Sequence, residues 1–522
     1  MNRKVLVTIV FVAVIFFSGV GYIVINNIVT AFKPVAMNIS AVQRATVSGN
    51  GGNAVIVGDY VYFIGNYVDT AEISYKQNEY NKVSHGALYR ARLDNNQESP
   101  TLGLPLYDDA DREQTQPGYV PHLLKHRQLI VPKIAGFESS ALYVFDKYLI
   151  YTSPNNTKNR YGQLQTNKLD FFRVDLDGRN HTHIYTTSND FVSASDFTVA
   201  YYGSKHIYIL IKDGNNLRRV SVTGDVGKTS TISNKVTSFA LPVVSAYNHY
   251  SGIDSETGVD PGNRSLAESY RGAMQFVYYT EELSEDDQKN YRGNILKRYR
   301  VSEGKSSVVI AKEKVPFASF SVKALSNRRL LYTINENVTL SNSGTFLYMT
   351  AQNWGANDDV PFASSTRHNN LVSDTIQSEE QFYLPTEYNP ASSDSIFAST
   401  ANDSLYIYRK LSGSSAVATY TTIPNVQSII AITSSTVYFT GPSGTVMTVS
   451  LYGDNDAQST GWTPDSLTRL TFFGNRIFYV KTFEADGNVT NSAMMIDLVN
   501  DKEFVLGRIA DKYLPESMRE QD

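Results

Sequence analysis

The chain is 522 residues long, which is enough for several ordinary domains or for one large body built from repeats. Its 47 lysines and arginines nearly balance 51 aspartates and glutamates, and the formal net charge of -4 disfavours nucleic-acid binding, which needs a basic surface. Cysteine is absent, which excludes disulfides, thiolate catalysis and cysteine-ligated zinc. The 35 tyrosines and 25 phenylalanines favour β-strands, where aromatic residues are enriched.

The first predicted element is a membrane-spanning helix. Residues Val5 to Ile25 carry no charge, and at about 1.5 Å per residue this run spans a hydrocarbon core of roughly 30 Å. A cleaved signal peptide is the alternative, but its apolar region normally has only about 7–15 residues. Arg3 and Lys4 precede the run, so the positive-inside rule places the N-terminus in the cytoplasm and the rest of the chain outside the cell membrane. We therefore assign residues 1–28 to a cytoplasmic stub and a single-pass signal anchor.

Residues 29–49 are predicted to be a linker. Its last part belongs to the segment Ser40 to Asn50, which we expect to add a strand to the last sheet, near Phe473 to Leu506, and so to close a ring. Residues 515–522 are assigned to a polar C-terminal tail.

Between Asn50 and Leu514 the chain repeats a two-part phrase. Its first part is a turn of Asp, Asn or Gly followed by a tyrosine-rich strand. Copies begin at Gly58, Phe145, Gly203, Arg271, Ser326, Ala401, Ser434 and Phe473. The second part is an alternating strand that ends in a polar turn, as is typical of hairpins. Copies begin at Ala87, Leu169, Leu217, Ile295, Gly444 and Ser492.

These repeats predict an all-β fold. Four-stranded sheets bury their faces only by packing on neighbouring sheets, and a closed ring of such sheets leaves few exposed edges. We expect residues 50–514 to form an extracytoplasmic β-propeller of about eight four-stranded blades. Seven blades are the alternative, because the spacing of the repeats is uneven.

Two phrases also carry a family resemblance. The phrases DKYLIYTS, from Asp146, and LDFFRVDLDG, from Leu169, resemble a family of bacterial membrane-anchored propellers of unknown function. That family is similar to the low-density-lipoprotein-receptor type and more loosely to TolB-like propellers, although the Tyr-Trp-Thr-Asp string of the receptor type is absent here. The resemblance implies a propeller fold and a binding role, and it carries no catalytic residues to transfer.

Two motifs suggest phosphate or calcium binding, and we interpret both as turns. In GDVGKTS, Gly224 to Ser230, the position at which a phosphate loop needs its first glycine is Val222. Asp175 and Asp177 lack the later ligands of a calcium loop, and with Gly178 they fit a hairpin turn. Calcium is the one cofactor that the acidic groups could bind, but none of them completes a motif, so no cofactor is predicted. The other acidic groups are Asp108 to Asp111, Asp254 to Asp260, Asn357 to Asp359 and Gly453 to Asp456.

Two pairs of histidines have spacings that could serve a metal. His181 and His183 would share one face of a strand, and His122 and His126 one face of a helix. Zinc would need a third ligand, which the sequence does not identify, so we interpret both pairs as surface histidines and leave the metal unassigned. The chain has no Gly-x-Ser-x-Gly elbow, and no catalytic residue is assigned.

Two long insertions are the predicted ligand-binding segments. They run from Ser245 to Gly272 and from Ala351 to Asn370. Loops longer than about 12–15 residues are usually functional or disordered. Aromatic rings flanked by polar groups suit a sugar or peptide, because a ring stacks and polar groups orient the ligand. The predicted ligand-binding residues are Tyr247, His249, Tyr250, Trp354, Arg367 and His368.

The sequence as a whole favours a binding or scaffolding module, displayed at the cell surface, for a protein, a peptide or a cell-wall glycan. The alternative is a glycan hydrolase or lyase with its active site at the mouth of the propeller channel. Paired carboxylates about 5–10 Å apart would favour that enzyme, and the sequence does not show such a pair.

Overall fold

The computed structural model describes most of the chain after residue 34. The described residues are 35–37, 39–40, 44, 46–67, 88–93, 122–123, 128–131, 140–155, 157, 159–162, 165, 167–190, 192–193, 196–202, 206–240, 246–248, 276–301, 304–310, 312–314, 316–325, 329–336, 344–351, 366–367, 381–383, 395–401, 403–410, 417–432, 436–451, 456–464, 470–473, 476–485, 488–498 and 502–506. Within these ranges, no helix has the length and apolar character that a bilayer crossing requires. The predicted anchor Val5 to Ile25 and the predicted tail 515–522 lie outside them.

The described strands form eight sheets, in agreement with the predicted all-β class. The first sheet has the order β17 (Ala246–Asn248), β1 (Thr46–Ser48), β2 (Ala54–Val57), β3 (Tyr60–Ile64), β5 (Leu88–Arg92) and β7 (Gln128–Val131). The second has β8 (Leu142–Phe145), β9 (Tyr148–Pro154), β10 (Leu169–Asp175) and β11 (Thr182–Thr186). The third has β12 (Phe197–Tyr202), β13 (His206–Asp213), β14 (Asn216–Ser221) and β15 (Thr229–Ser233).

The middle sheets keep the same four-stranded order. The fourth has β16 (Val236–Ala240), β18 (Phe276–Glu282), β19 (Asn294–Arg300) and β20 (Lys305–Val308). The fifth has β21 (Ala318–Leu325), β22 (Arg329–Glu336), β23 (Gly344–Ala351) and β24 (Thr366–Arg367). The sixth has β25 (Gln381–Tyr383), β26 (Ser395–Ala401), β27 (Ser404–Lys410) and β28 (Val417–Pro424).

The last two sheets complete the order. The seventh has β29 (Ser428–Ile432), β30 (Thr436–Thr440), β31 (Val446–Ser450) and β32 (Gln458–Ser459). The eighth has β33 (Thr471–Phe473), β34 (Arg476–Ala485), β35 (Asn488–Asp497), β36 (Lys502–Val505) and β6 (His122–Leu123), and β4 (Asn66–Tyr67) also pairs with β35. Two short 3-10 turns, Asp287–Lys289 and Lys312–Lys314, lie next to strands of the fourth and fifth sheets.

The repeated phrase of the sequence corresponds to equivalent strands. Counted from β2 in the first sheet, seven of the eight first-part copies contain the second strand of a sheet, namely β3, β9, β13, β18, β22, β30 and β34. The copy at Ala401 instead contains β27, the third strand of the sixth sheet. All six second-part copies contain third strands, which confirms the repeats.

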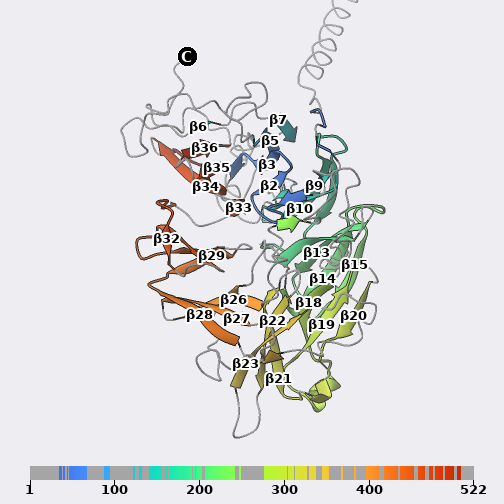
Figure 1. The fold of residues 1–522 in the computed structure, drawn as a ribbon. Coiled ribbons are helices and arrows are strands. Elements are labelled where there is room, and N and C mark those ends of the chain that lie inside the picture. The colour runs from blue at the N-terminus through green and yellow to red at the C-terminus, as the bar shows by residue number, and fades with distance from the viewer. Residues whose placement is uncertain are drawn as a thin grey trace, which may run out of the picture.

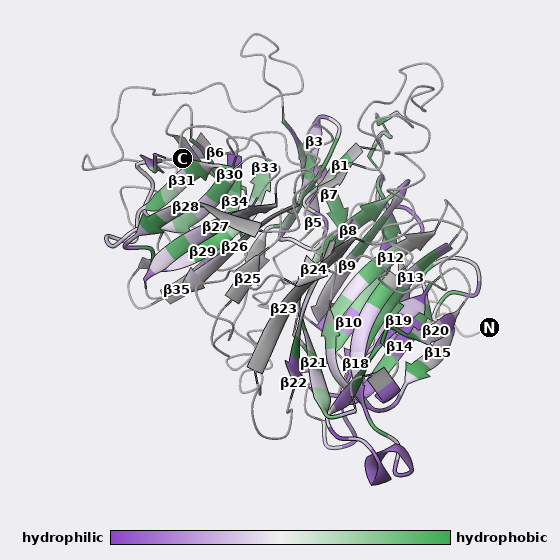
Figure 2. Ribbon diagram, turned by 60° about the horizontal axis from the view of Figure 1, so that its bottom comes forward, coloured by the Kyte–Doolittle hydropathy of each residue, from purple (hydrophilic) through white to green (hydrophobic). Residues whose placement is uncertain are grey.

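The eight sheets follow one another in chain order around a ring, and the last sheet lies beside the first (Figure 1). Hydrophobic residues follow the strands and hydrophilic residues gather at their ends (Figure 2). Buried side chains of neighbouring sheets pack together: Phe171 of the second sheet meets Phe197 of the third edge-on, with ring centroids 4.9 Å apart. Trp462 and Tyr479 form a similar contact between the seventh and eighth sheets. Packing of each sheet on the next therefore supplies the core.

The ring closes differently from the prediction. Among the described residues of Ser40 to Asn50, Thr46–Ser48 form β1, which joins the first sheet instead of the last: it forms a hairpin with β2, with Val47 opposite Val57. Gly49 and Gly51 allow this tight reversal, since both have positive φ angles, of 87° and 86°. The last sheet instead receives β4 and β6, two strands that follow β3 in the chain. Thr471 of β33 also donates a hydrogen bond to the Asn53 side chain over 2.7 Å.

Candidate binding site at the loop end of the second sheet

The second sheet has two distinct ends. At its turn end, short turns join β8 to β9 and β10 to β11. At its loop end, the 155–168 connection joins β9 to β10, and a second connection leads from β11 to β12 in the third sheet. These two names, turn end and loop end, are used below for the second sheet.

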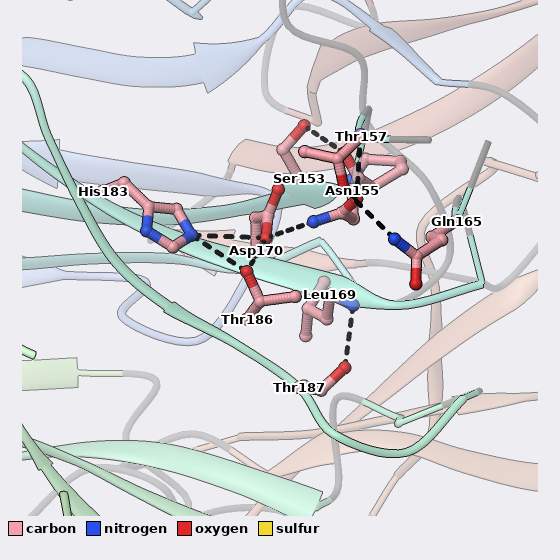
Figure 3. Close-up of polar contacts among 10 residues, drawn as sticks. Ser153, Asn155, Thr157, Gln165, Leu169, Asp170, His183, Thr186 and Thr187 are labelled. Carbon is pink, nitrogen blue, oxygen red and sulfur yellow. Dashed lines mark hydrogen bonds and ion pairs between the residues drawn. The ribbon is translucent and has the colours of Figure 1, made fainter. Parts of the chain in front are cut away.

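A buried carboxylate organises the loop end. Asp170, whose side chain is 5% exposed, accepts hydrogen bonds from Asn155 Nδ2 over 2.9 Å and from Thr186 Oγ1 over 2.5 Å (Figure 3). The Nε2 atom of His183 lies 3.3 Å from the same Asp170 oxygen and 3.0 Å from Thr186 Oγ1. The His183 side chain is 49% exposed, so the buried carboxylate holds an imidazole that solvent can reach.

Strand register explains why these side chains meet. Asp170 of β10 lies opposite Thr186 of β11, and a bulge between Phe171 and Phe172 then shifts the pairing, so that Phe172 lies opposite His183. Asp170 and Phe172 are two residues apart and therefore share one face of β10. This face brings together the buried carboxylate and an aromatic ring.

The predicted histidine pair lies on this face. The rings of His181 and His183 both lie 5.2 Å from the Phe172 ring, stacked in the first case and edge-on in the second. Phe172 in turn stacks on Tyr151, whose hydroxyl lies 2.6 Å from His181 Nε2. Burial, and to a smaller extent the nearby His183, lowers the pKa of His181. His181 is thus favoured in its neutral form.

The 155–168 connection extends the site. Asn155 Oδ1 accepts hydrogen bonds from the backbone N–H and the hydroxyl of Thr157, and Gln165 Nε2 donates to the Thr157 hydroxyl over 3.2 Å (Figure 3). Further along the connection, the Tyr161 side chain is 71% exposed, with the guanidinium of Arg160 stacked 4.7 Å from its ring centroid. An exposed aromatic ring therefore follows an ordered set of amide, hydroxyl, carboxylate and imidazole groups.

This arrangement has the chemistry of a binding surface. Hydroxyl and amide groups of a ligand can exchange hydrogen bonds with the network, and an apolar ligand face can stack on Tyr161. Within the described part of the chain, no three His, Asp or Glu side chains are grouped closely enough to hold a metal ion. The histidine pair therefore does not gain a third zinc ligand among these residues.

The structure describes two of the predicted ligand-binding residues, both by their backbone alone. Tyr247 lies in β17, which pairs with β1, so the first insertion reaches from the fourth sheet to the first. Arg367 lies in β24, opposite Tyr348 of β23. These two strands belong to different sheets. The remaining four residues, His249, Tyr250, Trp354 and His368, lie outside the described ranges.

The structure confirms that the Asp175 to Gly178 segment and the GDVGKTS segment both form turns. Gly178 has a φ of 89°, its N–H donates to Asp175 O, and the Arg179 N–H donates to Asp177 Oδ1 over 3.0 Å. These contacts close the β10–β11 hairpin. The GDVGKTS segment likewise joins β14 to β15, with Gly224 and Gly227 at positive φ.

Sequence reasoning missed Asp170, Asn155 and Tyr161. Asp170 lies in the segment LDFFRVDLDG, but only the two later aspartates, Asp175 and Asp177, were considered as candidates because they precede a glycine. The usable signal was the histidine pair, since a partner on the adjacent strand follows once the register of β10 and β11 is known.

Comparisons with known proteins find low sequence identities and low TM-scores. No family model and no curated protein matches the chain. Among solved structures, the β-propeller domain of the trilobed protease from Pyrococcus furiosus shares 10% identity, with 78% of this chain and 96% of that chain covered and a TM-score of 0.38. TolB from Acinetobacter baumannii shares 12% identity over 64% of this chain and 75% of its own, with a TM-score of 0.27. The polysaccharide lyase Uly1 shares 12% identity, with 74% of this chain and 95% of that chain covered and a TM-score of 0.34.

The ring of repeated antiparallel sheets decides the architecture. This chain is a β-propeller. At these identities the similar structures assign it no activity, and the propeller's role has to be argued from its own residues.

Proposed function

We propose that this propeller is a binding or scaffolding module held outside the cell by the single-pass anchor Val5 to Ile25, and that its ligand is a cell-wall glycan. We also propose that each of the eight sheets is one blade. The observation that carries the binding role is the 71% exposed Tyr161 in the connection whose base is ordered by Asp170 and Asn155.

The ligand class follows from the chemistry of these groups. Sugars offer a flat apolar ring face and many hydroxyl groups, so they suit an aromatic ring beside fixed donors and acceptors. Arg160, stacked on Tyr161, adds a positive charge, which favours a glycan that carries carboxylate groups. A protein or peptide ligand would need a larger apolar contact, and the loop end of the second sheet offers one strongly exposed aromatic ring among its described residues.

Binding can be tested with the full chain in detergent and purified cell-wall glycan. We expect Tyr161→Ala to weaken binding by about twofold to tenfold, because an aromatic contact contributes about 0.5–1.5 kcal/mol. Phe317→Ala removes another exposed aromatic ring, 45% exposed and distant in the chain, and should leave binding unchanged. Retention of full affinity by both Tyr161→Ala and His183→Ala would contradict a site at the loop end.

Location can be tested separately on protoplasts. External protease should degrade the propeller in intact protoplasts, since the positive-inside rule places residues after Ile25 outside. Protection of the propeller until the membrane is permeabilised would contradict the proposed topology.

A further inference from the structure

The linker that follows the predicted anchor is docked on the propeller. The Val35 N–H donates to Asp177 O over 3.0 Å, and Ala36 O accepts from Arg90 over 2.6 Å. Val35 and Met37 pack against the largest core cluster, and Ile39 is only 3% exposed. Residues 35–37 and Ile39 therefore belong to the folded body.

Arg90 makes this docking costly to undo. The arginine is completely buried, with its guanidinium 4.6 Å from the Tyr60 ring centroid. It donates to Gln128 Oε1 over 2.7 Å and to the Tyr62 hydroxyl over 3.4 Å, in addition to Ala36 O. A buried charge is tolerated only when hydrogen bonds replace its hydration. Release of the linker would remove one of the acceptors on which this buried cation depends.

The docked linker contacts the turn end of the second sheet. Its Val35 bonds to Asp177, in the β10–β11 turn, and Arg44 forms an ion pair of 3.1 Å with Asp146, in the β8–β9 turn. Arg44 also donates to Ile39 O over 2.9 Å, which ties the linker to itself. The proposed glycan site lies at the opposite end of the second sheet.

From this placement we infer that the docked linker orients the propeller on the membrane, with the turn end of the second sheet towards the lipid surface and the loop end away from it. Only residues 26–34 remain between the anchor and the docked Val35. These nine residues can span at most roughly 30 Å when fully extended. A tether attached at the turn end keeps that end closer to the bilayer. The inference rests on the proposed membrane anchor.

The absence of cysteine allows a direct test with single labels. Arg179→Cys places a donor fluorophore at the turn end, where the Arg179 side chain is 66% exposed. Asp190→Cys places it on the exposed β11–β12 connection at the loop end. The full chain is reconstituted in vesicles with acceptor-labelled lipid headgroups. We expect clearly higher energy transfer from position 179 than from position 190 in the outward-facing population.

The controls separate the orientation from the anchor. Arg44→Ala removes the contacts to Asp146 and Ile39, and should reduce the difference in transfer between the two labels; its folding is checked by thermal unfolding. Equal transfer from both positions in chains that float with the vesicles would overturn the orientation and leave the anchor intact. Failure of the full chain to float with vesicles would overturn the anchor and the orientation together.

Discussion

Thr471 and Asn53 are 418 residues apart in the chain, and a hydrogen bond of 2.7 Å joins their side chains where the last sheet meets the first. Both residues are nearly completely buried, at 4% and 3% exposure. Together with the pairing of β4 with β35, this contact joins the two ends of the repeat array.

Replacement of Thr471 by valine should destabilise the ring. Valine keeps the volume of the side chain but leaves the buried Asn53 oxygen without this donor, which costs about 1–3 kcal/mol. The measurement is the free energy of unfolding in urea. Thr471→Ser keeps the hydroxyl and should lower the free energy of unfolding less than Thr471→Val does. Equal decreases for the two variants would show that packing, and not the hydrogen bond, matters at this position.

Asp213 should contribute an acid-sensitive contact between the second and third sheets. Its carboxylate accepts hydrogen bonds from the Tyr185 hydroxyl over 2.8 Å, from the Ser188 N–H over 2.7 Å and from both the N–H and the side chain of Asn189. Burial alone would raise the pKa of Asp213, but these hydrogen bonds outweigh it and the pKa lies below its ordinary value. We expect Asp213→Asn to lower the free energy of unfolding by about 2 kcal/mol at pH 7.

The sign of its pH dependence follows from linkage. Because the folded-state pKa of Asp213 is depressed, its stabilisation is fully present above the unfolded value near 3.8 and is lost as the pH falls through the folded value. The difference between the wild type and Asp213→Asn should therefore shrink below about pH 3.8. Asp225→Asn is the matched control, since its pair with Lys228 is exposed and should contribute less than about 1 kcal/mol.

His181 should titrate below an ordinary histidine. Burial against Phe172 and Tyr151 lowers its pKa, so as the pH falls below about 6.5 the unfolded chain binds a proton before the folded chain does, and stability decreases. Phe172→Ala should remove part of this desolvation and move the pKa of His181 towards its ordinary value. The measurement is the NMR titration of the His181 ring protons, with Phe317→Ala as the control; an unchanged titration in Phe172→Ala would show that Phe172 does not bury the ring.

Two glycines with similar backbone angles should differ in their tolerance of alanine. Gly293 has a φ of 89°, and an added Cβ would lie 2.1 Å from Ala318 O, in the backbone of β21. Gly461 has a φ of 76°, but its added Cβ would meet nothing within 4 Å. Alanine at either position would adopt a left-handed backbone conformation, which costs about 1–2 kcal/mol. Gly293→Ala should therefore lose measurably more stability in urea unfolding than Gly461→Ala, and equal losses would contradict the clash.

The local features of this chain were predictable from its sequence. The hairpin of β10 and β11 follows from period-two alternation and from Asp177 and Gly178, because turn chemistry acts between residues that are close in the chain. The same reasoning located the second or third strand of every sheet. The spacing of His181 and His183 predicted that both rings lie on one side of a strand; both rings do lie against Phe172, although His181 stands one residue before β11.

Contacts between distant segments were decided by the tertiary structure. The prediction that Ser40 to Asn50 would add a strand to the last sheet was wrong, since β1 pairs with β2 of the first sheet. Apolar alternation does not determine which sheet edge a strand will join. Likewise, the partner of His183 depended on the register shift between β10 and β11, and the burial of Arg90 depended on acceptors at Tyr62, Gln128 and Ala36. Alternation and turns are local properties of the chain, whereas register and desolvation arise only once segments far apart in sequence pack together.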